Sequence, residues 1–135
     1  MTVQLNHTIV WCRDKAKSAA FYSDVLGLPP PTRFGPFQVV QLHNDVSLDF
    51  SDNGEDTIVV QHYAFLIDET TFDQVFARLR ERGLAYWADP ARCRGGEINR
   101  TDGGRGVYFQ DPDGHLLEVL TRPYQLSAFS GPQSA

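Results

Sequence analysis

The sequence predicts an α+β fold of two similar modules, each a strand, a helix and three further strands, with the helices outside. The main observation is a repeat: the apolar stretch opening at His7 recurs at His62, 55 residues later. The same offset relates Phe21 to Phe76, and Asp14 to Glu69. Self-similarity at a fixed period indicates a duplicated structural unit. An amphipathic segment and a glycine follow each histidine in the same order, which supports the duplication.

The first helix is expected over residues 15–26. Apolar side chains recur there at a spacing near 3.6, and Gly27 suits the left-handed conformation that commonly ends a helix. The three prolines at 29–31 prevent its continuation.

The second helix is expected before Gly83, which would end it. Thr71 and Gln74 have the spacing of a capping box at its start. Its apolar stripe consists of Phe72, Val75, Phe76 and Leu79.

The remaining apolar runs are short and bounded by turn residues, which is typical of strands. Asp111-Pro112-Asp113-Gly114 is a strong signal for a turn between two of them. The named runs are 39–42, 46–50, 107–110 and 116–120.

These elements predict one domain over residues 1–122, with modules at about 4–52 and 57–122. The tail, residues 123–135, is rich in Ser, Gly and Pro and should pack weakly. Residues 89–106, rich in Gly and Arg, do not fit the duplication. Long loops without structure are commonly functional or disordered, so we expect a mobile flap, with plain disorder as the alternative.

Composition and charge narrow the function classes. A chain of 135 residues with a net charge of −5 argues against binding the phosphate backbone of a nucleic acid, although a cationic small ligand fits. No apolar run approaches a membrane span, and the first residues lack the pattern of a signal peptide. Cys12 and Cys93 have no metal-type spacing and are expected to be free thiols. We therefore expect a cytoplasmic protein with a small-molecule partner.

Strand alternation places four polar side chains on the face of a sheet opposite the helices. His7, His62 and Glu118 can all project from it, with Asp49 as a possible fourth. A carboxylate inside an apolar strand such as LLEVL is costly unless it is paired or coordinated. Two imidazoles and one carboxylate form a divalent metal site with open positions, which can polarise a substrate or activate water.

Structural roles compete with this hypothesis. A single histidine on a strand is more often hydrogen-bonded or at the surface than a metal ligand. Asp49 could simply face solvent at a sheet edge. The ligand set also leaves the metal open, because Fe, Mn, Ni, Zn and Co all accept it.

Three segments resemble the vicinal oxygen chelate superfamily: LNHTIVWCRDKAKSAAFYSDVLGL, HYAFLID and DPDGHLLEV. This superfamily includes glyoxalase I, extradiol dioxygenases, fosfomycin-resistance thiol transferases and bleomycin-binding proteins. The resemblance implies two βαβββ modules whose mixed sheets curl into a cup around a metal. It also implies a homodimer, with the modules meeting within one chain or exchanged between two.

The resemblance also implies residue roles. His7, His62 and Glu118 fall on the usual metal-ligand positions, and Asp49 falls where glyoxalase I has a fourth ligand. Several family enzymes have a substrate-contacting tyrosine at the position of Tyr108; the alternative is a half-buried strand aromatic. A general base could be Asp49, or Glu118 released from the metal, with Tyr108 acting as an acid.

Other positions depart from particular activities. Trp11 replaces the arginine with which glyoxalase I binds a glutathione carboxylate. Extradiol dioxygenases usually have an additional histidine before the tyrosine, and the corresponding stretch here offers Asn99 instead, which weakens that activity. Asp102 lies among positions that hold the phosphonate in fosfomycin enzymes and would repel it, which argues against that activity. The bleomycin binders lack the His/His/Glu set that this sequence has.

The pocket is expected to have apolar walls. Trp11 lies four residues beyond His7, and Leu66 four beyond His62, on the same strand faces. With Tyr108 they suit a substrate with an apolar body and two adjacent oxygens. Trp11 could instead fill a dimer interface. The arginines of residues 89–106 could close over a substrate carboxylate.

The sequence therefore predicts a divalent-metal-dependent enzyme of the glyoxalase or dioxygenase type, acting on a substrate that chelates the metal through vicinal oxygens. The alternative is a non-catalytic protein that binds and sequesters a bleomycin-like drug. A metal-binding relic with a regulatory partner is a third possibility. Whether the chain catalyses or only binds stays open at this point.

Overall fold

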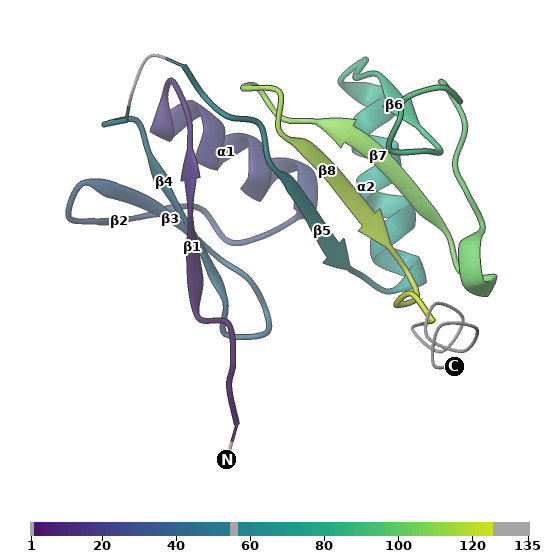
Figure 1. The fold of residues 1–135 in the computed structure, drawn as a ribbon, viewed down its shortest axis with the longest axis horizontal. Helices are drawn as coiled ribbons and strands as arrows, with labels where there is room; N and C mark the ends of the chain where they lie inside the picture. The colour runs from purple at the N-terminus through teal and green to yellow at the C-terminus, as the bar shows by residue number, and fades with distance from the viewer. Residues whose placement is uncertain (1, 55–56, 126–135) are drawn as a thin grey trace, which may run out of the picture. The chain divides into compact units, whose positions relative to one another are not determined.

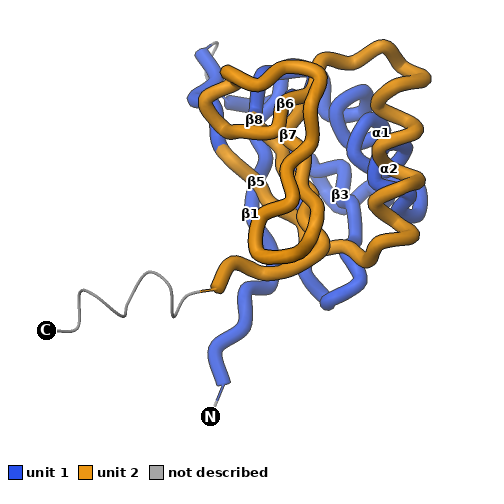
Figure 2. Tube along the Cα trace, turned by 90° about the vertical axis from the view of Figure 1, so that its right-hand side faces the viewer, with its two compact units in different colours: residues 1–61, 110–115 blue, residues 62–109, 116–135 orange. Residues whose placement is uncertain are grey.

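The computed structural model describes residues 2–54 and 57–125, and the chain divides into two compact units. The first unit is bounded by residues 1–61 and 110–115, and the second by residues 62–109 and 116–135 (Figure 2). Each unit has one α-helix and one four-stranded sheet (Figure 1). The α+β class is thereby confirmed. Among the described residues, no helix has the length and apolar character to span a membrane.

The sheet of the first unit has the order β1-β4-β3-β2. β1 runs parallel to β4, while β3 pairs antiparallel with both β4 and β2, so the sheet is mixed. The elements are β1 (His7–Trp11), α1 (Lys15–Leu26), β2 (Thr32–Phe34), β3 (Phe37–Gln41) and β4 (Ser47–Ser51).

Helix α1 has the predicted bounds. The Asp14 side chain accepts a hydrogen bond from the Lys17 backbone N–H, which satisfies one free donor of the first turn. Gly27 ends the helix with φ +72°, a conformation that a side chain would disfavour. α1 packs against β3 and β4, where Tyr22 and Phe50 are both fully buried.

The sheet of the second unit has the order β5-β8-β7-β6, with β5 parallel to β8. It therefore repeats the strand order of the first sheet. The elements are β5 (His62–Leu66), α2 (Glu69–Glu81), β6 (Tyr86–Trp87), the short 3-10 helix η1 (Thr101–Gly103), β7 (Gly106–Gln110) and β8 (Leu116–Leu120).

Helix α2 starts earlier than predicted. Asp68 is its N-cap and accepts a hydrogen bond from the Thr71 backbone N–H, so the capping box expected at Thr71 and Gln74 is wrong. Aspartate is among the preferred N-cap residues, so Asp68 begins the helix three residues before Thr71. The expected stripe is buried at Phe72, Val75 and Leu79.

The predicted strand faces agree with the observed burial. In β1, His7, Ile9 and Trp11 are exposed, whereas Val10 is fully buried. In β5, His62, Ala64 and Leu66 are exposed, and the residues between them are half-buried. Alternation along a strand explains both patterns, because successive side chains point to opposite faces.

Residues 89–106 are not the structureless segment that was expected. The Asp89 carboxylate accepts hydrogen bonds from the backbone N–H groups of Cys93 and Arg94, at 3.0 and 2.7 Å for Oδ1. Asn99 pairs with Gly106, and its side chain donates to the Ala88 carbonyl at 2.8 Å. Hydrogen bonds between the Asp89 and Asn99 side chains and the backbone therefore order this segment. The first half has no equivalent segment, so comparing the two halves could not predict these contacts. Most of the predicted tail, residues 126–135, lies outside the described residues.

Candidate metal and substrate site

The side chains of His62 and Glu118 meet on one face of the second sheet. β5 and β8 are parallel, and their register pairs Ala64 with Glu118 and His62 with Leu116. His62 Nε2 lies 3.1 Å from Glu118 Oε1. Glu118 is 2% exposed, so this carboxylate is almost completely removed from water.

The hydrogen bond of His62 Nδ1 determines what His62 Nε2 can do. His62 Nδ1 lies 2.9 Å from the Leu116 carbonyl oxygen, which can only accept, so Nδ1 carries a hydrogen. Nε2 then faces a carboxylate oxygen. Either an ion pair between the imidazole and the carboxylate or a metal ion held between them is compatible with this contact. A histidine whose other nitrogen donates to a carbonyl is the usual arrangement of a metal ligand.

The spacing of these two donor atoms also fits a metal. Metal bonds to histidine nitrogen and carboxylate oxygen are about 2.0–2.2 Å long. Two ligands at right angles around such an ion are therefore separated by about 3 Å. His62 and Glu118 could hold a divalent ion as adjacent ligands without a large movement of either side chain.

Two tyrosines extend this pair into a hydrogen-bonded chain. The Tyr124 hydroxyl donates to Glu118 Oε2 at 2.7 Å. The Tyr108 and Tyr124 hydroxyl oxygens are 3.3 Å apart, and because the Tyr124 hydrogen is used on Glu118, Tyr108 is the donor between them. The Tyr108 ring also stacks on His62, with 6.0 Å between ring centroids.

Both phenols are held in the protonated form. Burial raises the pKa of Tyr108, and its contact with Tyr124 and the charge of Glu118 raise it further. Burial also raises the pKa of Tyr124, where the Glu118 carboxylate acts in the same direction. Tyr108 can therefore donate a hydrogen bond or a proton, and it is poorly suited to accept one as a base.

A small pocket opens at this chain of residues. Its lining includes Tyr108, Glu118, Tyr124, Arg105 and Arg122. Arg105 is not available to a ligand, because its guanidinium pairs with Glu69 at 2.7 Å and with Asp73 at 2.9 Å. That the arginines of residues 89–106 close over a substrate stays a prediction, and for Arg105 it would require these two ion pairs to break. Tyr124 was missed by sequence reasoning, because it lies in the tail that was expected to pack weakly.

The first unit carries the other two candidate ligands. His7 is exposed on β1, and its Nδ1 lies 2.8 Å from the Asn6 side-chain oxygen, which leaves Nε2 available. Asp49 lies on β4, and its Oδ1 accepts a hydrogen bond from Ser47 Oγ at 2.9 Å. Among the described residues, no hydrogen bond joins His7 to Asp49.

The structure thus brings His62, Glu118 and Tyr108 together in the second unit. In the described part of either unit, no three His, Cys, Asp or Glu side chains gather as a metal-binding group. The predicted ligand set draws His7 from the first unit and His62 and Glu118 from the second. The remaining pocket candidates, Trp11 and Leu66, are 43% and 61% exposed on β1 and β5.

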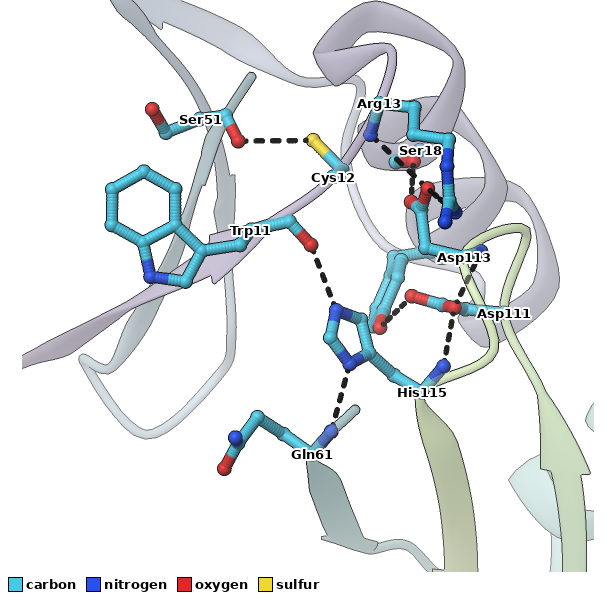
Figure 3. A network of polar contacts seen from close by, with 10 residues as sticks. Trp11, Cys12, Arg13, Ser18, Ser51, Gln61, Asp111, Asp113 and His115 are labelled. Atoms are coloured by element: carbon cyan, nitrogen blue, oxygen red, sulfur yellow. Dashed lines mark hydrogen bonds and ion pairs between the residues drawn. The ribbon is translucent and has the colours of Figure 1, made fainter. Parts of the chain in front are cut away.

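His115 is a histidine of the opposite kind. It is fully buried in the first unit, and its Nε2 donates to the Trp11 carbonyl at 2.8 Å (Figure 3). Its Nδ1 accepts from the Gln61 backbone N–H at 2.9 Å. Both ring nitrogens thus contact backbone groups of the first unit, which gives His115 a structural role.

Residues 110–115 also carry two buried aspartates of the first unit (Figure 3). Asp113 accepts from the Ser18 hydroxyl at 2.9 Å and from the Arg13 backbone N–H at 3.1 Å. Asp111 accepts from the Tyr22 hydroxyl at 2.7 Å. The predicted turn is confirmed by the Gly114 N–H bond to the Asp111 carbonyl, at 3.1 Å. Asp113 therefore holds the start of α1 and Asp111 holds Tyr22 farther along the same helix, so both carboxylates have partners within the first unit.

Neither cysteine joins a site. Both are free thiols, as predicted, with Cys12 buried and Cys93 exposed. Burial, with the nearby charge of Asp113, raises the pKa of Cys12 to about 12. Cys12 is therefore a protonated thiol at physiological pH and cannot act as a nucleophile or ligand.

Comparison with known proteins identifies the family. The sequence model of the Glyoxalase/Bleomycin resistance protein/Dioxygenase superfamily matches residues 4–119. The solved structure of Oxidase ChaP-H1 is 60% identical with a TM-score of 0.89, covering 91% of this chain and 98% of that one. Oxidase ChaP-H2 is 59% identical with a TM-score of 0.89, covering 92% and 97%.

A more distant relative has a different named activity. Metallothiol transferase FosB of Shouchella clausii (strain KSM-K16) is 34% identical over 126 residues, which cover 87% of this chain and 79% of the relative. The family match spans both histidine-bearing strands and the buried glutamate of β8. This chain therefore belongs to the glyoxalase/bleomycin resistance protein/dioxygenase superfamily.

Proposed function

We propose that this protein is a metal-dependent oxidase that acts on a small substrate with two adjacent oxygens. The observation that carries the proposal is the buried Glu118 carboxylate 3.1 Å from His62 Nε2, a pair of donor atoms that a divalent ion could bridge. Two proteins named as oxidases, 60% and 59% identical to this chain over most of its length, favour dioxygen chemistry.

The proposed ligands are His62, Glu118 and His7, the last on the strength of the family resemblance. We also propose a homodimer, in which His7 could come from either copy. A bound divalent ion with open positions would polarise the two substrate oxygens and, if it is redox-active, would bring dioxygen to the same place. Fe, Mn, Ni, Zn and Co remain the candidates, because the donor set does not separate them.

The side chains around the ligands supply binding and proton transfer. Tyr108 stacks on His62 and keeps its proton, so it would donate a hydrogen bond to a substrate oxygen that carries negative charge. Trp11 and Leu66 are exposed apolar side chains on their sheets and would contact the body of the substrate. Asp49, held by Ser47, is the candidate general base.

Thiol transfer is the second candidate, because the FosB relative is named a metallothiol transferase. Burial chiefly raises the pKa of Tyr124, and the negative charge of Asp102 raises it further. Asp102 therefore contributes negative potential to the pocket, which argues against an anionic phosphonate substrate. Transfer of a thiol to a substrate without a phosphonate charge would still be compatible with the same candidate ligands.

The third candidate is a protein that binds and sequesters a drug without catalysing a reaction.

The test loads the metal-stripped protein with Fe²⁺, Mn²⁺, Co²⁺, Ni²⁺ or Zn²⁺ and measures dioxygen consumption with catechols and hydroxyquinones. We expect consumption with at least one redox-active metal, and its loss in His62→Ala and Glu118→Ala. His43→Ala, in an exposed turn, is the matched control. Glutathione consumption with an epoxide, and no dioxygen uptake, would favour thiol transfer. Substrate binding with no bound metal would favour sequestration.

A further inference from the structure

Tyr124 lies four residues beyond the end of β8, and its hydroxyl is directed at the buried carboxylate. It donates to Glu118 Oε2 at 2.7 Å, while His62 Nε2 lies 3.1 Å from the other oxygen, Oε1. Each oxygen of Glu118 thus has its own side-chain partner. Tyr124 itself is 45% exposed, so the packing of its ring alone does not explain this position.

A buried carboxylate that binds a metal through one oxygen leaves the other in need of a hydrogen-bond donor. A neutral hydroxyl meets that need without removing the negative charge that attracts the metal. An arginine there would form an ion pair and compete with the metal, and Arg105 of the same pocket is instead held by Glu69 and Asp73. Tyr124 therefore supplies the kind of partner that a ligand carboxylate requires.

We propose that Tyr124 is a positioning residue, which holds Glu118 Oε2 so that Oε1 alone is presented beside His62 to a divalent metal. This inference rests on the proposed metal site and adds a residue outside the predicted ligand set. Residues that hydrogen-bond a ligand carboxylate change metal affinity by about 10–100-fold when they are removed. The segment that follows β8 is thereby part of the metal site.

The test compares Tyr124→Phe with Tyr86→Phe. Both variants lose one phenolic hydroxyl from the second unit, and the Tyr86 ring packs edge-on against Phe76, with 5.1 Å between centroids, in the same unit but outside the pocket lining. Co²⁺ is titrated into each metal-free protein, and its visible absorption reports both affinity and coordination. We expect at least a 10-fold loss of Co²⁺ affinity and an altered band in Tyr124→Phe, and neither in Tyr86→Phe.

The outcomes separate the two proposals. Equal Co²⁺ affinity and identical bands in wild type and Tyr124→Phe would overturn the positioning role and leave the metal site intact. If wild type and Tyr86→Phe both fail to bind Co²⁺, the proposed function itself is overturned, and the role of Tyr124 falls with it. Equal losses in Tyr124→Phe and Tyr86→Phe would indicate a general effect on the unit and contradict the inference.

A second measurement on the metal-free protein tests the hydrogen bond directly. Tyr124→Phe should lower the thermal unfolding midpoint when Glu118 is present, because a buried carboxylate oxygen loses its donor. In the Glu118→Met background the same change should have little effect, since no carboxylate remains. Additive effects of the two substitutions would contradict the contact on which the inference depends.

Discussion

The two units place a histidine and a carboxylate at matching strand positions, but their side chains behave differently. In the first sheet the register pairs His7 with Ser47 and Ile9 with Asp49. In the second it pairs His62 with Leu116 and Ala64 with Glu118. Asp49 is thus the counterpart of Glu118. Strand register alone therefore does not make a metal-binding pair.

Side-chain length and the neighbouring residue explain the difference. Glu118 reaches His62 Nε2, whereas the shorter Asp49 accepts a hydrogen bond from Ser47 on its own strand. Leu116, at the position equivalent to Ser47, offers no hydroxyl, and its backbone carbonyl orients His62. The histidine and the carboxylate of the second unit thus contact each other, whereas those of the first unit have separate partners.

The largest expected effect is the loss of a ligand. His62→Ala, Glu118→Ala and His7→Ala should each weaken metal binding by more than about 100-fold, because removal of a supporting group alone costs 10–100-fold. Asp49→Asn should cost less than about 10-fold, since Asp49 is already satisfied by Ser47. Competition with a chromogenic chelator measures these affinities. If Asp49→Asn lost as much metal affinity as Glu118→Ala, the proposed difference between the two units would be contradicted.

A structural histidine should affect stability instead. His115→Ala removes buried hydrogen bonds to the Trp11 carbonyl and from the Gln61 N–H, and should lower the unfolding free energy by about 2–4 kcal/mol. His43→Ala, exposed in a turn, should change it by less than about 0.5 kcal/mol. Urea denaturation of the metal-free proteins distinguishes the two. Equal stabilities would contradict the assigned role of His115.

Exchanging the side-chain lengths of Glu118 and Asp49 tests whether length causes the difference between the two units. Glu118→Asp withdraws the carboxylate from both His62 and Tyr124, and should weaken metal binding about 10-fold, the lower end of the cost of a lost supporting contact. Asp49→Glu should tighten metal binding a few-fold, because the longer side chain is no longer matched to Ser47. The same chelator competition applies. An unchanged affinity in both variants would show that length is not the difference between the units.

The smallest effect concerns the thiols. With a pKa near 12, Cys12 stays protonated as the pH rises from about 7 to 9, so a thiol reagent should not label it in the folded protein. Exposed Cys93 should be labelled, and its alkylation should leave metal binding unchanged. Peptide mass spectrometry before and after unfolding identifies the labelled residue. Labelling of Cys12 in the folded state would contradict its burial.

Local patterns determined much of this protein from sequence. The period between His7 and His62 predicted two similar units, the apolar spacing predicted α1 at about its observed bounds, and alternation assigned the exposed and buried faces of β1 and β5. These features depend on neighbours in the chain. Helix periodicity and strand alternation follow from the spacing of apolar residues along the chain, so they can be predicted from the sequence alone.

Only the tertiary structure decided which polar groups meet. The contact of Tyr124 with Glu118, the opposite roles of His62 and His115, and the pairing of Arg105 with Glu69 join residues from different elements. The sequence singled out His62 and Glu118 as candidates, but it gave no partner for either residue and no role for Tyr124. Hydrogen-bond partners are fixed by atomic distance and direction after folding, so residue order could nominate the candidates and the fold alone could pair them.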